Sequence, residues 1–276
     1  MTTLCRVLEV SRAGFYAWRS RVLSEAQTRR EGLTEQVTRI HAEVKGRYGS
    51  PRMHAELVGR GHACCVNTVA RVMRGAGVAA KTKRKFRRTT DSNHPHPVAE
   101  NVLDRDFDPA EPNASWVADV TYVPTREGWV YLAVVVDLFS RLVVGWSMAA
   151  AMTSRLVVDA LDMALGRRPG GSSGLVAHSD RGSQSASEHY QRRLGEERIT
   201  CSTSRRGNCW DNAPMESFFA SLNKELVHDE DYATREQATA SLFAYIETFD
   251  NRVRRHSPLG YVAPAEYERT HNQTHR

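Results

Sequence analysis

Three short runs rich in β-branched and aromatic residues follow one another in the middle of the chain. They cover residues 116–123, 129–136 and 142–148, and only short breaks separate them. Gly128 marks the first break and residues 137–141 form the second, so the pattern predicts an antiparallel three-stranded meander. A sheet is therefore expected at the centre of the fold.

After this meander, helical and strand patterns alternate. The expected elements are a helix over 153–165, a strand over 175–178, a helix over 187–194, a strand over 199–203, and a helix that begins at Asp211 or Asn212 with Pro214 in its first turn. Three antiparallel strands followed by alternating helices and strands predict an α/β fold with a mixed sheet and helices on its faces. This order matches the ribonuclease-H-like architecture.

The first eighty residues have the periodicity of helices. A short helix is expected within the first twenty residues, with Tyr16 and Trp18 among its apolar contacts. Further helices are expected from Leu33, over 51–58, and after a cap at Asn67 or Thr68, the last one with Val69, Val72 and Met73 inward and Arg71 and Arg74 outward. Two helices joined by the glycine turn 59–61 fit a helix-turn-helix-like unit, although any small helical bundle shows the same pattern.

Positive charge is concentrated in the first third of the chain. Residues 1–97 contain 19 Lys and Arg against 7 Asp and Glu, whereas residues 98–276 contain 19 against 25. Six of the eight residues in 81–88 are basic, and the polar, proline-containing segment 91–97 follows. Such asymmetry is typical of nucleic-acid-binding proteins, so we predict that residues 81–88 follow a phosphate backbone. A solvated basic surface is the alternative interpretation.

Composition is otherwise that of an ordinary globular protein, with 41% hydrophobic and 25% charged residues. No apolar run reaches the roughly 20 residues that span a bilayer, and the N-terminus lacks the pattern of a signal peptide. We therefore expect a cytoplasmic protein. The five cysteines have no metal-binding spacing, which favours reduced thiols over a structural zinc site.

Three acidic residues lie where the predicted elements can bring them together. Asp119 interrupts an apolar strand, and a carboxylate on a half-buried sheet is costly unless it is paired or bound to a cation. Asp180 follows the strand over 175–178, at the side where ligand crevices of such sheets open. Glu216 lies in the first turn of the last helix, at the edge of a core-facing stripe formed by Met215, Phe218, Phe219, Leu222 and Leu226.

Any one of these acids alone is explained as well by a helix cap or a surface charge. Three carboxylates converging on one point would instead bind two divalent cations, Mg²⁺ or Mn²⁺, because these hard ions prefer oxygen ligands. One ion would be held by Asp119 with Asp180 and the other by Asp119 with Glu216, about 3.5–4 Å apart. Such a site cleaves or joins phosphodiester bonds.

Long strings around these acids resemble the insertion-sequence transposases, specifically the second-reading-frame product of the large bacterial family that shares its catalytic core with retroviral integrases. The matching text covers the chain nearly end to end and is far more specific than a short motif. It comprises YGSPR (48–52), residues 116–146, HSDRGSQ (178–184), SRRGNCWDNAPMESFF (204–219) and NRVRRHSPLGY (251–261).

This resemblance implies that Asp119, Asp180 and Glu216 are the metal-binding catalytic residues of a DDE transposase. The implied activity is metal-dependent strand cleavage and strand transfer at the ends of an insertion sequence, through a replicative route with a circular intermediate. The implied organisation is a helix-turn-helix-like DNA-binding region with a basic arm (1–90), a linker (91–110), a ribonuclease-H-like integrase catalytic core (111–228) and a C-terminal helical extension (229–276).

Two other functions stay open on the residues alone. One is a structure-selective nuclease on the same fold, which hydrolyses DNA without joining it. The other is a DNA-binding regulator that acts through residues 1–97 and needs no catalytic acid.

The predicted partner is DNA, both as element ends and as target. Candidate phosphate contacts, each with an ordinary surface charge as the alternative, are Arg52, Arg71, Arg74, Lys81, Lys83, Arg84, Lys85, Arg205, Arg206, Lys224, Arg254 and Arg255. The resemblance further implies a homo-oligomer in the DNA complex and an upstream-frame product that is fused to this chain or bound by it.

Three positions depart from the pattern of the family. Asn223 stands seven residues after Glu216, where lysine is common, and the neighbouring Lys224 is rotated by about 80° from Glu216 on a regular helix. Ser185 and Asp250 stand where tyrosine is usual. Because that lysine is expected to contact DNA near the reacting phosphate, its replacement predicts weaker binding of the ends. The three acids are intact, and the departures together leave both a decayed and a weakened copy of the enzyme open.

Overall fold

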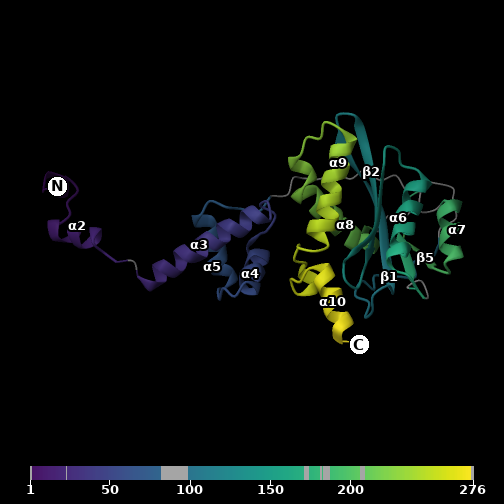
Figure 1. Cartoon of the computed structure of the whole chain (residues 1–276), viewed down its shortest axis with the longest axis horizontal. Coiled ribbons are helices and arrows are strands. Elements are labelled where there is room, and N and C mark those ends of the chain that lie inside the picture. The colour runs from purple at the N-terminus through teal and green to yellow at the C-terminus, as the bar shows by residue number, and fades with distance from the viewer. Residues whose placement is uncertain are drawn as a thin grey trace. The chain divides into compact units, whose positions relative to one another are not determined.

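The computed structural model of the chain divides into two compact units, Met1–Ala80 and Lys81–Arg276 (Figure 1). It describes residues 2–22, 24–81, 99–170, 174–180, 182, 187–205 and 209–274. The candidate DNA contacts Lys83, Arg84, Lys85 and Arg206 and the departure Ser185 lie outside these residues. Among the described residues, no helix has both the length and the apolarity that crossing a bilayer requires.

The N-terminal unit is helical, as predicted. Its helices are α1 (Thr2–Val7), α2 (Arg12–Arg19), α3 (Glu25–Glu43), α4 (Ser50–Gly59) and α5 (Val66–Gly75). Helices α3, α4 and α5 pack against one another around a core of buried side chains that includes Val37, Ile40, Tyr48, Met53, Leu57, Val69 and Val72.

Two expectations for this unit are wrong in detail. The first twenty residues form two helices, because Glu9 adopts a left-handed conformation with a φ of 53° and the Ser11 hydroxyl caps α2 by accepting a hydrogen bond from the Gly14 amide at 2.9 Å. Tyr16 and Trp18 are 47% and 71% exposed, so they are not core contacts. Helix α5 begins after Cys65, earlier than the predicted cap at Asn67 or Thr68.

A five-stranded mixed sheet forms the centre of the second unit, in the order β3-β2-β1-β4-β5. The strands are β1 (Ser115–Thr125), β2 (Gly128–Asp137), β3 (Val143–Ala149), β4 (Val176–Ser179) and β5 (Thr200–Thr203). The first three pair antiparallel, which confirms the meander. Strand β4 pairs parallel with both β1 and β5, so β1 is the central strand between the meander and the parallel half.

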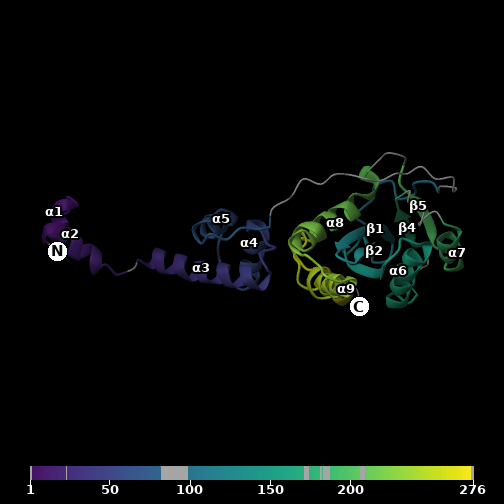
Figure 2. The same cartoon turned by 90° about the horizontal axis from the view of Figure 1, so that it is seen from above.

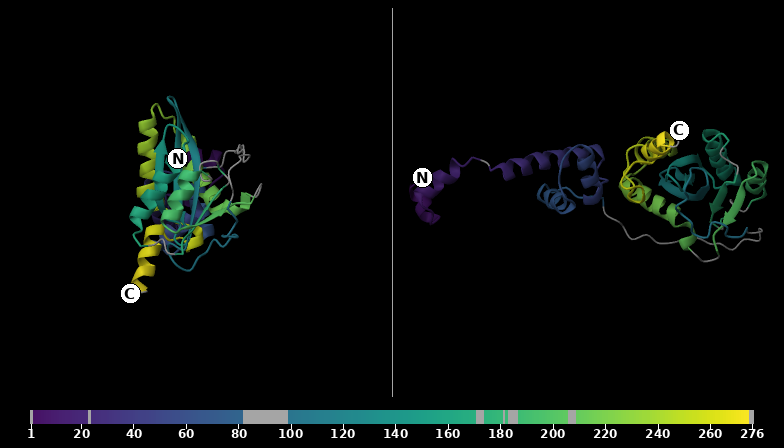
Figure 3. Two further views of the ribbon diagram at one scale, coloured as in Figure 1. Left: turned by 90° about the vertical axis from the view of Figure 1, so that its right-hand side faces the viewer. Right: turned by 90° about the horizontal axis from the view of Figure 1, so that it is seen from below.

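Helices cover both faces of this sheet. Helix α6 (Ser154–Arg167) and helix α7 (Glu188–Glu196) lie on one face, and helices α8 (Ala213–Glu225) and α9 (Arg235–Phe243) lie on the other (Figures 2 and 3). A π-helical turn (Ala244–Asp250) continues α9, and α10 (Pro264–Thr274) ends the described chain. The layered arrangement is the mixed-sheet fold that the sequence predicts.

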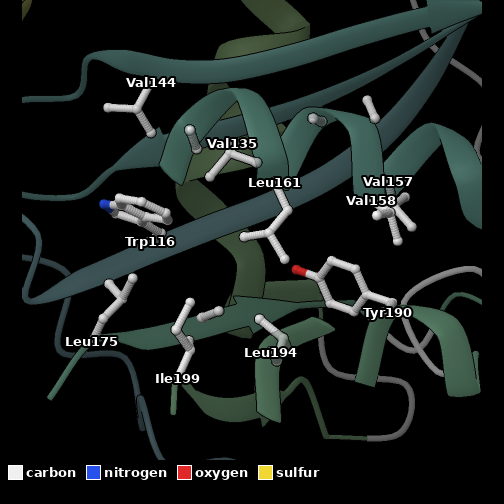
Figure 4. Close-up of a cluster of buried hydrophobic side chains, with 14 of the residues drawn as sticks. Trp116, Val135, Val144, Val157, Val158, Leu161, Leu175, Tyr190, Leu194 and Ile199 are labelled. Atoms are coloured by element: carbon white, nitrogen blue, oxygen red, sulfur yellow. The ribbon is translucent and has the colours of Figure 1, made fainter. Parts of the chain in front are cut away.

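The main core lies between the sheet and the α6 and α7 face. Trp116 of β1, Leu161 of α6 and Tyr190 of α7 are all buried in it. Figure 4 shows Leu161 and Tyr190 pointing toward one another across this cluster. Burial of Trp116, Ala118 and Val120 against this core turns the alternate residues of β1, including Asp119, toward α8 on the opposite face.

Contact between β3 and α6 is so close that only glycine fits at position 145. A Cβ atom on Gly145 would lie 2.1 Å from the carbonyl oxygen of Ala160 and 2.8 Å from the Cβ of Ala164. We expect Gly145→Ala to destabilise the protein by about 1–3 kcal/mol through overpacking, measured as a lower unfolding temperature. Gly166→Ala in α6 is the control, because its Cβ meets nothing within 4 Å; equal effects of the two substitutions would contradict this packing.

Candidate active site

Asp119 and Asp180 lie side by side at the centre of the sheet. Ala118 of β1 is the register partner of Ser179 at the end of β4, so the next residue of each parallel strand is one of the two acids. Asp119 is half-buried, and one of its carboxylate oxygens accepts a hydrogen bond from the Val120 amide at 2.7 Å. One carboxylate oxygen of Asp180 accepts from the Gly182 amide at 3.0 Å.

Glu216 reaches the same region from the opposite direction. It lies in the first turn of α8, and this helix packs against β1. The five residues predicted as its core stripe are all buried, whereas Glu216 is exposed at the edge of that stripe. The helix therefore presents this carboxylate at the surface beside the strand that carries Asp119.

The charges of the three acids act on one another. The pKa of Asp119 is raised well above its usual value, first by burial, then by the charge of Asp180, and further by the charge of Glu216. The hydrogen bond from Val120 offsets only part of this effect. Three mutually repelling carboxylates, one of them half-buried, are a set of ligands that suits a hard cation.

The acids do not form a closed coordination shell as they stand. Within the described part of the chain, no three His, Cys, Asp or Glu side chains are close enough together to hold a metal ion. Asp119 and Asp180 are placed by the sheet backbone, while Glu216 is on a helix of the facing layer. The sheet therefore brings two of the three acids together, and α8 presents the third from the facing layer.

A buried chain of hydrogen bonds supports the Asp180 end of β4. Burial lowers the pKa of His178 to about 4, so its ring is neutral, with Nδ1 2.9 Å from the Ser202 hydroxyl and Nε2 3.1 Å from the Ser204 hydroxyl. The Ser202 oxygen already accepts from two backbone amides, those of Val102 and Leu103. Ser202 therefore donates to Nδ1, and Nε2–H donates to Ser204.

A second support lies just before α8. The Asp211 carboxylate is buried and accepts from the Arg205 amide, from two Arg205 guanidinium nitrogens at 2.9 Å, and from Arg105 Nε at 2.8 Å. The hydrogen bonds from Arg205 and Arg105 hold the pKa of Asp211 well below its usual value. The predicted start of this helix is confirmed, because Asn212 is the N-cap residue of α8, although its side chain makes no capping hydrogen bond. Asp211 binds the two arginines instead.

Most of the described candidate DNA contacts are accessible. Arg71 and Arg74 are exposed on α5, as their predicted outward orientation requires, and Arg52 and Lys224 are partly exposed on α4 and α8. Arg255 is partly exposed and donates through Nη1 to the Tyr261 carbonyl at 2.9 Å.

Two other candidates are engaged within the protein. Lys81 Nζ donates to the Glu225 carbonyl at 3.0 Å and lies 2.7 Å from Asp229 Oδ2. Arg254 is 5% exposed and binds both carboxylate oxygens of Glu225. The structure contradicts the prediction that Arg254 faces DNA, because its guanidinium is used inside the fold.

Comparisons with known proteins agree with this geometry. An HTH-like domain model matches residues 28–86, and integrase core domain models match residues 109–209 and 216–272. The transposase InsF for insertion sequence IS3A of Escherichia coli strain K12 is 44% identical over 267 residues, which is 96% of this chain and 92% of that protein. The chain belongs to the IS3 family of transposases.

Two further proteins are similar to this transposase. An uncharacterized 31 kDa protein of insertion element IS600 from Shigella sonnei is 41% identical to this transposase. The aligned region covers 98% of the transposase and 99% of the IS600 protein. The HTLV-2 integrase catalytic core domain, solved in complex with magnesium, aligns with 57% of the chain and 97% of that domain, at 20% identity and a TM-score of 0.42. The transposase thus combines an HTH-like region with an integrase core.

Asn223, one of the three departures from the family pattern, lies on the same helix as Glu216. Helix α8 runs without a break from Ala213 to Glu225, so Asn223 lies about 20° around the helix from Glu216 and Lys224 about 80° from it. Asn223 therefore occupies the side that faces the acids. Asp250, the other described departure, is buried 3.6 Å from both Arg254 Nη1 and His256 Nε2, which places it inside the fold rather than at the site.

Proposed function

We propose that Asp119, Asp180 and Glu216 bind the divalent cations with which this transposase cleaves DNA at the ends of its insertion sequence and transfers the strands to a target. The observation that supports this is the raised pKa of Asp119, caused after burial by the charges of Asp180 and Glu216. Mutual repulsion of this kind is relieved by a cation, and Mg²⁺ or Mn²⁺, two per site, fits a set of carboxylate oxygens.

Bound cations of this type lower the pKa of an attacking hydroxyl and stabilise the leaving oxygen at phosphorus. The surrounding residues of the protein hold the three carboxylates in position. Asp119 lies beside both other acids and is the ligand they share. The hydrogen bonds of His178 hold the strand end that carries Asp180, and the buried stripe of α8 fixes the helix that carries Glu216. No covalent bond between protein and DNA is needed.

Recognition of DNA is proposed to be divided between the two units. Exposed Arg71 and Arg74 on α5 fit phosphate or base contacts of a helix-turn-helix-like reader, and the basic stretch 81–88 follows it in the sequence. In the integrase core, Arg205 and Lys224 are the accessible candidates. A homo-oligomer on DNA, and an upstream-frame product fused to or bound by this chain, complete the proposal, together with the domain limits predicted from the sequence.

Joining of DNA is the reaction that distinguishes this proposal from a nuclease on the same fold. The full chain is incubated with Mg²⁺, a pre-cut end of the element and a supercoiled plasmid, and the products are separated on a gel. We expect plasmid molecules covalently joined to the end, and none when EDTA replaces Mg²⁺. Nicked or shortened DNA without any joined product would show a nuclease instead.

A further inference from the structure

The segment before α8 carries a second group of side chains that the metal site does not use. Trp210 lies in a one-turn 3₁₀-helix (Cys209–Asn212) that leads directly into α8. Its side chain is 68% exposed, whereas its neighbours Asp211 and Asn212 are buried. A large aromatic ring is thus held at the surface by a short turn in which the side chains of Asp211 and Asn212 are buried.

Two arginines flank this tryptophan. Arg105 and Arg205 share the buried Asp211 carboxylate, and their side chains are 44% and 48% exposed. Arg105 uses only Nε for this pair among the hydrogen bonds of the described residues, so its terminal nitrogens are available to another acceptor. Two carboxylates, Asp211 and Asp104, balance the two guanidinium groups, since Asp104 Oδ1 lies 3.3 Å from Arg205 Nη2. The attraction for a phosphate therefore comes from the remaining hydrogen-bond donors of Arg105 and not from a net charge.

The position of the turn relates it to the acids. Trp210 precedes Glu216 by six residues, two along the 3₁₀ turn and four along α8, which corresponds to about 10 Å of chain. At 3.4 Å of axial rise for each nucleotide of one strand, this distance spans roughly three nucleotides.

We propose that Trp210 and Arg105 form a nucleotide subsite for the DNA strand that runs into the active site. A base of that strand stacks on the Trp210 indole, and its phosphate binds the terminal nitrogens of Arg105. Stacking on an aromatic face tolerates any sequence, so this subsite holds the strand near the acids, while the recognition of the ends belongs elsewhere. The subsite rests on the function proposed above.

Fluorescence of 2-aminopurine tests the stacking. The base analogue is placed at successive positions beside the reacting 3′-hydroxyl of a pre-cut element end, and its quenching by the full chain is measured without metal. We expect strong quenching at one position with the wild type and with Trp210→Phe, and loss of it with Trp210→Ala. The KM for the end in strand transfer is expected to rise by about 5- to 100-fold in Trp210→Ala. The matched control is Trp129→Ala, which removes another exposed tryptophan, 46% exposed on β2.

The dependence of DNA affinity on salt concentration tests the phosphate contact of Arg105. Arg105→Ala is expected to lower the slope of log affinity against log salt by about 0.7–0.9, the value for one lost phosphate contact. Arg155→Ala, on the opposite face of the sheet and 76% exposed, is expected to leave this slope unchanged.

Unchanged quenching and KM in Trp210→Ala would overturn the subsite. So would a change in the sedimentation of the free protein without any change in the DNA signals, because Trp210 would then be a contact between copies. A wild-type protein that quenches through Trp210 but never joins DNA would refute the proposed function and not the subsite, so the two failures are distinguishable.

Discussion

Replacing Glu216 with glutamine is expected to reduce strand transfer by at least about a thousandfold. The substitution removes a carboxylate ligand but keeps the size and helical preference of the side chain. Catalysis by bound metal ions is worth several kcal/mol, and each ~1.4 kcal/mol changes the rate tenfold. Asp119→Asn and Asp180→Asn are expected to have the same effect, measured as joining of pre-cut ends to plasmid in Mg²⁺.

Binding of the element ends by these variants is expected to change little, because the DNA-reading arginines of α5 are untouched. The unfolding temperature of Asp119→Asn should not fall, since the substitution removes a half-buried charge repelled by two neighbours. Glu236→Gln is the control, because Glu236 is an exposed acid on α9. Near-normal Mg²⁺-dependent transfer by any one of the three variants would refute its assignment as a ligand.

Replacing Arg254 with methionine is expected to destabilise the second unit by about 3–5 kcal/mol, the cost of leaving a buried charge without its partner. Glu225 is 3% exposed and accepts from Arg254 Nε and Nη2, each at 3.0 Å, and from the Tyr245 hydroxyl at 3.0 Å. Arg254 Nη2 also donates to Ser221 at 2.8 Å. At about 2–4 °C for each kcal/mol in a unit of this size, the unfolding temperature should fall by roughly 6–20 °C.

Two controls separate this effect from a general loss of charge. Arg39→Met removes an exposed partner of Glu35 in the N-terminal unit and is expected to cost less than ~1 kcal/mol. The double variant Arg254→Met/Glu225→Gln is expected to regain part of the lost stability, because the buried charge of Glu225 is removed together with that of its partner. Recovery is incomplete, since the buried Asp250 also lies 3.6 Å from Arg254 and loses that contact. An unfolding temperature that Arg254→Met leaves unchanged would contradict the buried pair. Glu225 and Ser221 lie on the helix that carries Glu216, so this pair also ties the C-terminal segment to the active site.

Local periodicity was sufficient to predict much of the fold and the position of the acids. Alternation along β1 predicts which residues share a face with Asp119, and the buried stripe of α8 predicts that Glu216 lies at its edge. Both patterns repeat over a few residues, so the sequence records them directly. The parallel pairing of β4 with β1, which brings Asp180 beside Asp119, follows from the fold class rather than from any local pattern.

Contacts between distant segments could not be predicted in this way. Asp211 or Asn212 was expected to cap a helix, and Asn212 is its N-cap residue. No local pattern predicts that the Asp211 carboxylate is bound by Arg105, which lies more than one hundred residues earlier in the chain. Arg254 was expected to contact DNA, because the guanidinium group matches the geometry of a phosphate. Its burial depends on Glu225, and no periodic pattern connects those two positions.

For two aromatic residues the error is the reverse, because they were predicted to be buried and are exposed. Tyr16 and Trp18 were expected to be buried because apolar side chains usually are, yet the short helix α2 has no buried residue. Trp210 is exposed for a different reason, since its turn is anchored by the burial of Asp211. The side chains that local patterns misplace are therefore those whose surroundings are set by long-range pairing.

Binding of Mn²⁺ to the full chain, followed through the electron paramagnetic resonance signal of the free ion, tests most directly whether the three acids form one metal site. The wild type is compared with Asp119→Asn, Asp180→Asn, Glu216→Gln and the control Glu236→Gln. We expect saturable binding by the wild type and the control, and an affinity at least about tenfold weaker in each of the three active-site variants. A wild type that binds no Mn²⁺, or one of these three variants with undiminished affinity, would contradict a shared site.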